Sequence, residues 1–190
     1  MQEYSRDDIR VTGIRLHTVQ TRRRTGAISS HIVLELDTDA GIVGVGEISD
    51  LDCYRMYMPD PEAIRIGLEK VALGQNVFQI AALHERLLAY MPAYFRYANT
   101  YPPFTPASQV AAGIEMAFYD VVGKALGVPV HTLLGGKVRD SFEVTYPVFQ
   151  AKKESDTERY LGYMADLIEE GVTRFRYYVG VDFEQDERFL

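Results

Sequence analysis

A chain of 190 residues that is 47% hydrophobic and 25% charged has an ordinary globular composition, with room for one large domain or for one domain and part of another. Its formal net charge of −7 argues against nucleic acid or an anionic membrane surface as the main partner. No apolar run approaches the ~18 residues of a membrane-spanning helix, and residues 1–8 do not form a secretory signal. The single cysteine, Cys53, excludes an intrachain disulfide, so we expect a soluble, cytoplasmic protein.

Alternating apolar residues near the start predict a small antiparallel sheet. A first strand covers residues 9–19, where Thr12-Gly13 shifts the alternation as a β-bulge would. A second strand covers residues 32–37, strong turn chemistry follows at residues 37–41, and the chain returns over residues 42–45 as a hairpin partner. These segments predict a meander of short strands.

The segments beside the strands predict one close contact and two loops. Gly44 and Gly46 lie in the returning strand, where a missing side chain lets another backbone or a loop approach closely. Residues 21–30 are polar and basic and contain a glycine, which predicts a mobile loop. A second irregular stretch is predicted over residues 47–60.

Helical periodicity follows the sheet. It predicts helices over residues 61–73 and 80–90 and a third that starts at Pro106, after an aromatic and proline-bearing connection over residues 91–105. The residues predicted to face inward in these helices are Ala63, Ile64, Leu68, Val71, Ala81, Leu83, Leu87, Leu88, Val110, Ile114, Ala117, Phe118, Val121 and Ala125.

The third helix has the clearest boundaries. Thr105 is a plausible N-cap before Pro106, and Gly127 fits the left-handed position just past the last turn. Asp120 precedes Lys124 by four residues, which is the favourable orientation for a helix ion pair. On periodicity alone this segment is a well-capped core helix.

The segmentation changes after Gly136. A strand over residues 142–149, a helix over 155–170 and a strand over 173–179 predict a parallel pair with a crossover helix, and Asp182 begins a further helix. Such a unit cannot bury both faces of a sheet by itself, and a (β/α)₈ barrel needs ~250 residues. We therefore expect the chain to be one portion of a longer enzyme; the alternative is a compact α+β protein in which this unit joins the first sheet.

One stretch carries a family resemblance. From Gly113 to Gly136 the sequence reads as a helix, a glycine stop, a Val-Pro-Val connector and a Leu-Leu-Gly-Gly turn, in that order. This order resembles the signature of the mandelate racemase and muconate lactonizing enzyme branch of the enolase superfamily. The resemblance implies an α+β N-terminal capping domain, with an antiparallel sheet plus helical bundle, over residues 1–138. The start of a (β/α) TIM-type barrel would follow over residues 139–190.

The resemblance also implies a chemistry. Members of this branch use Mg²⁺ to remove the proton next to a carboxylate, so it implies a dehydratase of acid sugars, or a racemase or cycloisomerase, that acts on a small carboxylate substrate such as an acid sugar or hydroxy acid. It implies metal ligands beyond residue 190 and a homo-oligomer. Two alternatives stay open: a non-catalytic binding relative and an inactive capping-domain fragment.

The acidic and histidine residues within the chain are interpreted otherwise. They are scattered over loops or lack ligand spacing, so we expect solvated, exposed or structural roles and no metal site among them. These residues are Glu47, Asp50, Asp52, Asp60, His17, His31, His84 and His131.

Two residues near the end of the chain are the candidate catalytic pair. The family's second barrel strand carries Lys-x-Lys, and Arg176 and Tyr178 occupy the matching positions. Alternation places both side chains on one face of the strand, and a guanidinium within ~4–6 Å stabilises a phenolate, so a tyrosine here can serve as the base. The alternative is that Tyr178 is an ordinary strand residue and Arg176 an ion-pair partner.

Substrate-binding residues are predicted on the two loops. Arg24 and Tyr54, with Tyr57 behind them, supply the donors that carboxylate and hydroxyl groups need. The alternative is that they lie at the rim without a ligand contact.

Overall fold

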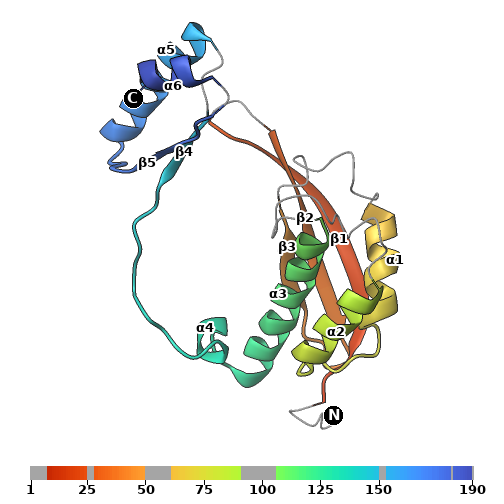
Figure 1. Ribbon diagram of the computed structural model, residues 1–190. Coiled ribbons are helices and arrows are strands. Elements are labelled where there is room, and N and C mark those ends of the chain that lie inside the picture. The colour runs from red at the N-terminus through yellow and green to blue at the C-terminus, as the bar shows by residue number, and fades with distance from the viewer. Residues whose placement is uncertain are drawn as a thin grey trace. The chain divides into compact units, whose positions relative to one another are not determined.

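The computed structural model describes six segments of the chain: residues 8–24, 28–49, 61–90, 106–149, 153–180 and 182–189. The chain divides into two compact units, Met1–Lys137 and Val138–Leu190. Figure 1 labels the helices and strands of each unit. None of the described helices has both the length and the apolar character needed to cross a membrane.

The first unit is built on an antiparallel sheet. Its strands β1 (Val11–Arg22), β2 (Ile28–Thr38) and β3 (Gly44–Ile48) lie in the order β1-β2-β3. The predicted bulge is confirmed, because the β1–β2 register shifts between Val11 and Gly13. Burial alternates along β2, as expected for a sheet with one covered face. The residues of β2 that enter the core are Ile32, Leu34 and Leu36.

The polar segment between the first two strands is shorter than predicted. β1 continues to Arg22 and β2 begins at Ile28, and these two residues pair with each other. The prediction of a loop over residues 21–30 is therefore wrong at both ends, and residues 25–27 lie outside the described segments. Backbone hydrogen bonds extend this hairpin without apolar side chains, so hydrophobic alternation does not reveal the extension.

Three long helices accompany the sheet. They are α1 (Pro61–Ala72), α2 (Ile80–Tyr90) and α3 (Pro106–Leu126), and the predicted ranges are confirmed to within a residue. In Figure 1 α3 runs along β3, and α1 lies beside β1. The buried side chains of the helices join those of the sheet in one core that includes Ile64, Leu68, Leu83, Leu87, Val110, Ile114, Phe118 and Val121.

Two of the predicted inward positions are wrong. Ala63 and Ala81 are exposed, whereas Ala72 is buried. The larger residues around them set the rotation of each helix, because a methyl group contributes little apolar area. The side chain of Leu88 lies outside what the structure describes.

A short helix, α4 (Val130–Leu133), follows α3 and was not predicted. Gly127, with φ of +68°, ends α3, and the amide of Val128 donates to the carbonyl of Gly123 at 2.9 Å. The predicted role of Gly127 is thus confirmed. A helix of one turn has too few residues to show a period, so the sequence of α4 reads only as a connector.

The contact between α3 and β3 depends on residues without side chains. A Cβ atom at Gly46 would overlap the carbonyl oxygen of Gly113, and one at Gly44 would overlap that of Ala117. The predicted close approach of another backbone to Gly44 and Gly46 is therefore confirmed, and the approaching element is α3.

The second unit is a parallel strand–helix–strand arrangement with a further helix. It comprises β4 (Tyr146–Val148), α5 (Glu154–Glu169), β5 (Phe175–Tyr177) and α6 (Phe183–Phe189). β4 and β5 pair in parallel, with Val148 opposite Tyr177. The strands predicted over residues 142–149 and 173–179 are too long, because the ladder pairs only three residues on each side.

Helix α5 buries fewer apolar side chains than their spacing in the sequence predicts. Tyr160, Met164, Leu167 and Ile168 have the spacing of an inward face. Leu167 is buried, but Ile168 is 58% exposed. Ile168 lies about 100° further around the helix than Leu167, beyond the side that the two short strands cover.

Candidate functional site

The carboxyl ends of β4 and β5 bring two aromatic rings together. Phe149 follows β4 directly, Tyr178 follows β5 directly, and the amide of Tyr178 donates to the carbonyl of Val148 at 3.1 Å. The two rings stack with centroids 5.5 Å apart and planes inclined by 9°. Parallel strands end at the same edge of a sheet, which is where (β/α) barrel enzymes carry their reactive groups.

Arg176 and Tyr178 are in direct contact. The guanidinium donates a hydrogen bond from Nη2 to the hydroxyl oxygen of Tyr178, and its central carbon lies 4.8 Å from the centroid of the ring. Both side chains are exposed, Tyr178 to 37%. A phenol held by a cation and open to solvent has the arrangement that a general base needs.

The opposite side of β5 packs against α6. Tyr177 lies between the two candidate residues, and its ring stacks on Phe189 with centroids 4.1 Å apart. Its hydroxyl donates to Oδ1 of Asp186 at 3.0 Å. Because neighbouring side chains of a strand alternate, Arg176 and Tyr178 lie on the face turned away from α6.

The other predicted site residues are placed elsewhere. Arg24 is exposed and follows β1 in the first unit. Tyr54, with Tyr57, lies outside the described residues. Of the four predicted site residues, the structure thus brings Arg176 and Tyr178 into contact with each other.

The acidic residues and histidines are placed as follows. Glu47 lies in β3, whereas Asp50, Asp52 and Asp60 lie outside the described residues. Three of the four histidines pair with a glutamate in the first unit: His31 with Glu47 at 2.8 Å, His84 with Glu115 at 2.9 Å and His17 with Glu35 at 3.1 Å. The hydrogen bond from His17, followed by that from Arg15, lowers the pKa of the Glu35 carboxyl.

The described residues do not fit a magnesium site. They contain no group of three or more histidine, cysteine, aspartate or glutamate side chains placed to hold a metal ion. Divalent ions such as Mg²⁺ need several oxygen ligands, and the carboxylates of Glu35, Glu47 and Glu115 are each already paired with a histidine.

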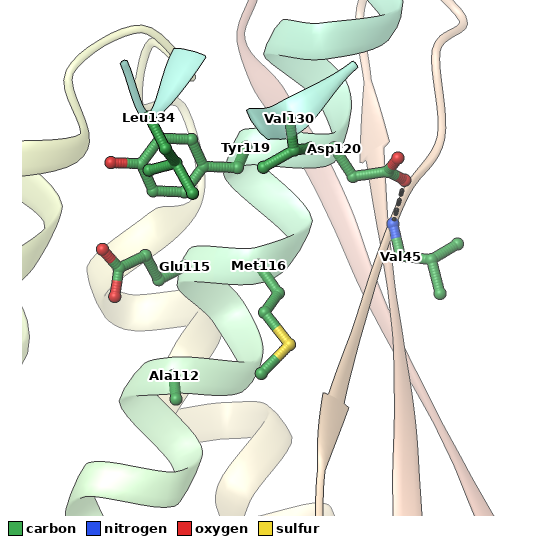
Figure 2. A pocket seen from close by; sticks show the side chains of 8 residues that line it. All are labelled: Val45, Ala112, Glu115, Met116, Tyr119, Asp120, Val130 and Leu134. Carbon is green, nitrogen blue, oxygen red and sulfur yellow. Dashed lines mark hydrogen bonds between the residues drawn. The ribbon is translucent and has the colours of Figure 1, made fainter. Parts of the chain in front are cut away.

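Helix α3 also supplies hydrogen-bonding partners for the backbone at the edge of the sheet. The amide of Val45 in the edge strand β3 donates to Oδ2 of Asp120 at 2.8 Å (Figure 2). Lys124 donates to the same carboxylate oxygen at 2.6 Å and to the carbonyl of Val43 at 2.8 Å. The predicted Asp120–Lys124 helix pair is confirmed. Its bonds to β3 were not foreseen, because no local pattern links residues 75 positions apart.

A mostly apolar hollow of about 480 Å³ lies beside α3, as Figure 2 shows. It is lined by Val45, Ala112, Glu115, Met116, Tyr119, Asp120, Val130 and Leu134. Both of its carboxylates are engaged, Glu115 with His84 and Asp120 with Val45 and Lys124. The hollow therefore offers a packing surface.

Removing the Asp120 carboxylate is expected to weaken the first unit. Asp120→Ala leaves the amide of Val45 and the ammonium of Lys124 without this acceptor, which costs about 1–3 kcal/mol of unfolding free energy. Asp120→Asn keeps an acceptor for Val45 and should cost about 1 kcal/mol or less. Urea denaturation of both variants measures the difference, and equal stability of Asp120→Ala and the parent would contradict an edge-protecting role.

Comparison with known proteins adds a family and a fold. A family model described as the mandelate racemase / muconate lactonizing enzyme N-terminal domain matches residues 8–135. The chain is 26% identical to an N-succinyl-L-Arg/Lys racemase from Bacillus cereus over 94% of its own length and 46% of the racemase. It is 29% identical to a cis-3-hydroxy-L-proline dehydratase from Roseibium aggregatum over 81% of its own length and 38% of the dehydratase.

A solved structure shares the fold. The muconate lactonizing enzyme from Pseudomonas putida superposes with a TM-score of 0.69 at 24% identity, over 95% of this chain and 47% of that one. The chain thus spans less than half the length of these relatives. The resemblance based on Gly113–Gly136 is confirmed, as is the fold class of an antiparallel sheet with helices followed by the start of a barrel.

Proposed function

The chain belongs to the mandelate racemase / muconate lactonizing enzyme family, and we propose on this basis that it is part of an enzyme that removes the α-proton of a small carboxylate substrate. Relatives named as a racemase and a dehydratase support an isomerase or lyase activity. The proposed substrates are acid sugars or hydroxy acids, and the reaction is a dehydration, a racemisation or a cycloisomerisation.

The contact between Arg176 and Tyr178 is the observation that carries the proposal. In the proposed step the Tyr178 phenolate takes the proton from the carbon next to the substrate carboxylate. The Arg176 guanidinium stabilises the phenolate before the transfer, through the hydrogen bond to the same oxygen. The pair favours dehydration slightly, because it resembles arginine–tyrosine pairs of acid-sugar dehydratases in the superfamily.

The remaining assignments are proposals from the family and from single residues. We propose residues 1–138 as the capping domain and 139–190 as the start of the barrel, which the division into two units near Lys137 supports. Arg24 and Tyr54 are the proposed substrate-binding residues. Mg²⁺ is proposed on the family alone, with ligands beyond residue 190; so are a homo-oligomer and, with a single cysteine in the chain, a cytoplasmic location.

A second candidate is a non-catalytic relative. The family's Lys-x-Lys is replaced by Arg176 and Tyr178, and losing both lysines favours a protein that binds a carboxylate without changing it. An inactive capping-domain fragment is the remaining possibility for the 190 residues.

Proton exchange tests the proposal directly. The full-length protein, incubated in D₂O with Mg²⁺ and a panel of acid sugars and hydroxy acids, is expected to replace the α-proton of at least one of them with deuterium, as NMR would detect. A chelator is expected to stop the exchange, and added Mg²⁺ to restore it. Binding of a panel member without exchange would favour the non-catalytic relative.

A further inference from the structure

Asp186 is the buried charged side chain of the described residues, with only 4% of its surface exposed. A buried carboxylate is costly unless it accepts hydrogen bonds. Asp186 accepts two: Oδ1 from the hydroxyl of Tyr177 at 3.0 Å, and Oδ2 from the amide of Gly180 at 2.7 Å. It lies on α6, so the carboxylate ties this helix to the segment that leaves β5.

The two donors stand on either side of Tyr178. Tyr177 precedes it, and Gly180 follows after one residue in a left-handed turn with φ of +106°. Tyr177 is held a second time, by the stack of its ring on Phe189. Because alternation couples the direction of one side chain to that of the next, fixing Tyr177 and Gly180 fixes the direction of Tyr178.

We propose that Asp186 is a positioning residue for Tyr178: its carboxylate clamps the chain before and after the tyrosine and so keeps the phenol on the Arg176 guanidinium. This inference rests on the proposed role of Tyr178 as the base. Displacing a reacting group by about 1 Å can cost on the order of 100-fold in rate. Loss of the clamp is therefore expected to lower the rate of proton transfer more than the affinity for substrate.

The test is Asp186→Asn in the full-length protein. An amide has one acceptor oxygen in place of two and carries no charge, so it can accept from only one of Tyr177 and Gly180 and loses the charge-assisted character of both hydrogen bonds. We expect kcat to fall about 10- to 100-fold with KM nearly unchanged, while circular dichroism shows a folded protein. Tyr177→Phe removes one of the two hydrogen bonds and keeps the ring, so it should show a smaller fall. This variant also tests the clamp should Asp186→Asn fail to fold.

Asp182→Asn is the matched control. Asp182 accepts from the amides of Glu184 and Gln185 at the start of α6, and asparagine caps a helix as well as aspartate does. It changes the same kind of side chain on the same element without touching the clamp. Its kcat is expected to equal that of the parent, and a fall as large as that of Asp186→Asn would overturn the assignment to Asp186.

A second measurement does not depend on turnover. Crystal structures of Asp186→Asn and of the parent show whether the Tyr178 hydroxyl keeps its hydrogen bond from Arg176. If the clamp positions the phenol, the hydroxyl of Tyr178 lies away from the guanidinium in Asp186→Asn. A phenol in its parent position would overturn the clamp. Exchange that survives Tyr178→Phe would instead refute the proposed base, and the position of the phenol would still decide on the clamp.

Discussion

Gly46→Ala is expected to destabilise the first unit by about 3 kcal/mol or more, at the upper end of the cost of overpacking. The added methyl group would overlap the carbonyl oxygen of Gly113, which belongs to the backbone of α3 and cannot rotate away as a side chain would. The helix would have to move off β3, and the hydrogen bond from Val45 to Asp120 would be lost with it. Urea denaturation measures the loss.

The effect should be graded among glycines of the same unit. Gly67 in α1 has no atom within 4 Å of an added Cβ, so Gly67→Ala is expected to stabilise the helix by about 0.5–1 kcal/mol. Gly113→Ala should fall between the two, since its nearest neighbour at 2.7 Å is the movable Cγ1 of Ile48. A Gly46→Ala variant as stable as the parent would show that α3 does not lie against β3 as described.

The fold of the first unit could be predicted where the pattern is local. Neighbouring residues alone predict the helical period of α3 and its end at Gly127. They also predict the close backbone contact that Gly44 and Gly46 permit by having no side chain. The extension of β1 to Arg22 could not be predicted in this way, because it depends on backbone pairing with β2 rather than on apolar side chains. The one-turn helix α4 is too short to show a period.

The candidate site could likewise be predicted from the sequence only in part. Alternation along one strand is enough to predict that Arg176 and Tyr178 share a face, and their contact agrees with it. The stack of Phe149 on Tyr178 depends on the register between β4 and β5, which no pattern within either strand specifies. In the sequence, Asp186 is one of several acidic residues in a segment with the composition of an exposed helix. Its burial is evident only from the structure, in which α6 packs on β5.

Tyr178→Phe in the full-length protein is expected to lower the rate of α-proton exchange by about 10²- to 10⁴-fold, the usual contribution of a general base. Phenylalanine keeps the ring that stacks on Phe149 and lies beside the Arg176 guanidinium, and it removes only the oxygen that would accept the proton. Substrate affinity should therefore change little. Deuterium incorporation measured by NMR, with a binding titration beside it, separates the two quantities.

Tyr160, a second tyrosine whose ring lies against a guanidinium, provides the control. Tyr160 on α5 lies with its ring centroid 4.9 Å from the central guanidinium carbon of Arg159, so Tyr160→Phe removes the same hydroxyl from a similar pair away from the end of β5. Its exchange rate should match that of the parent. Arg176→Gln should also lower the exchange rate, because the guanidinium no longer donates its charge-assisted hydrogen bond to the Tyr178 oxygen. Full exchange by Tyr178→Phe would remove this residue as the base, and another group of the full-length protein would then have to take the proton.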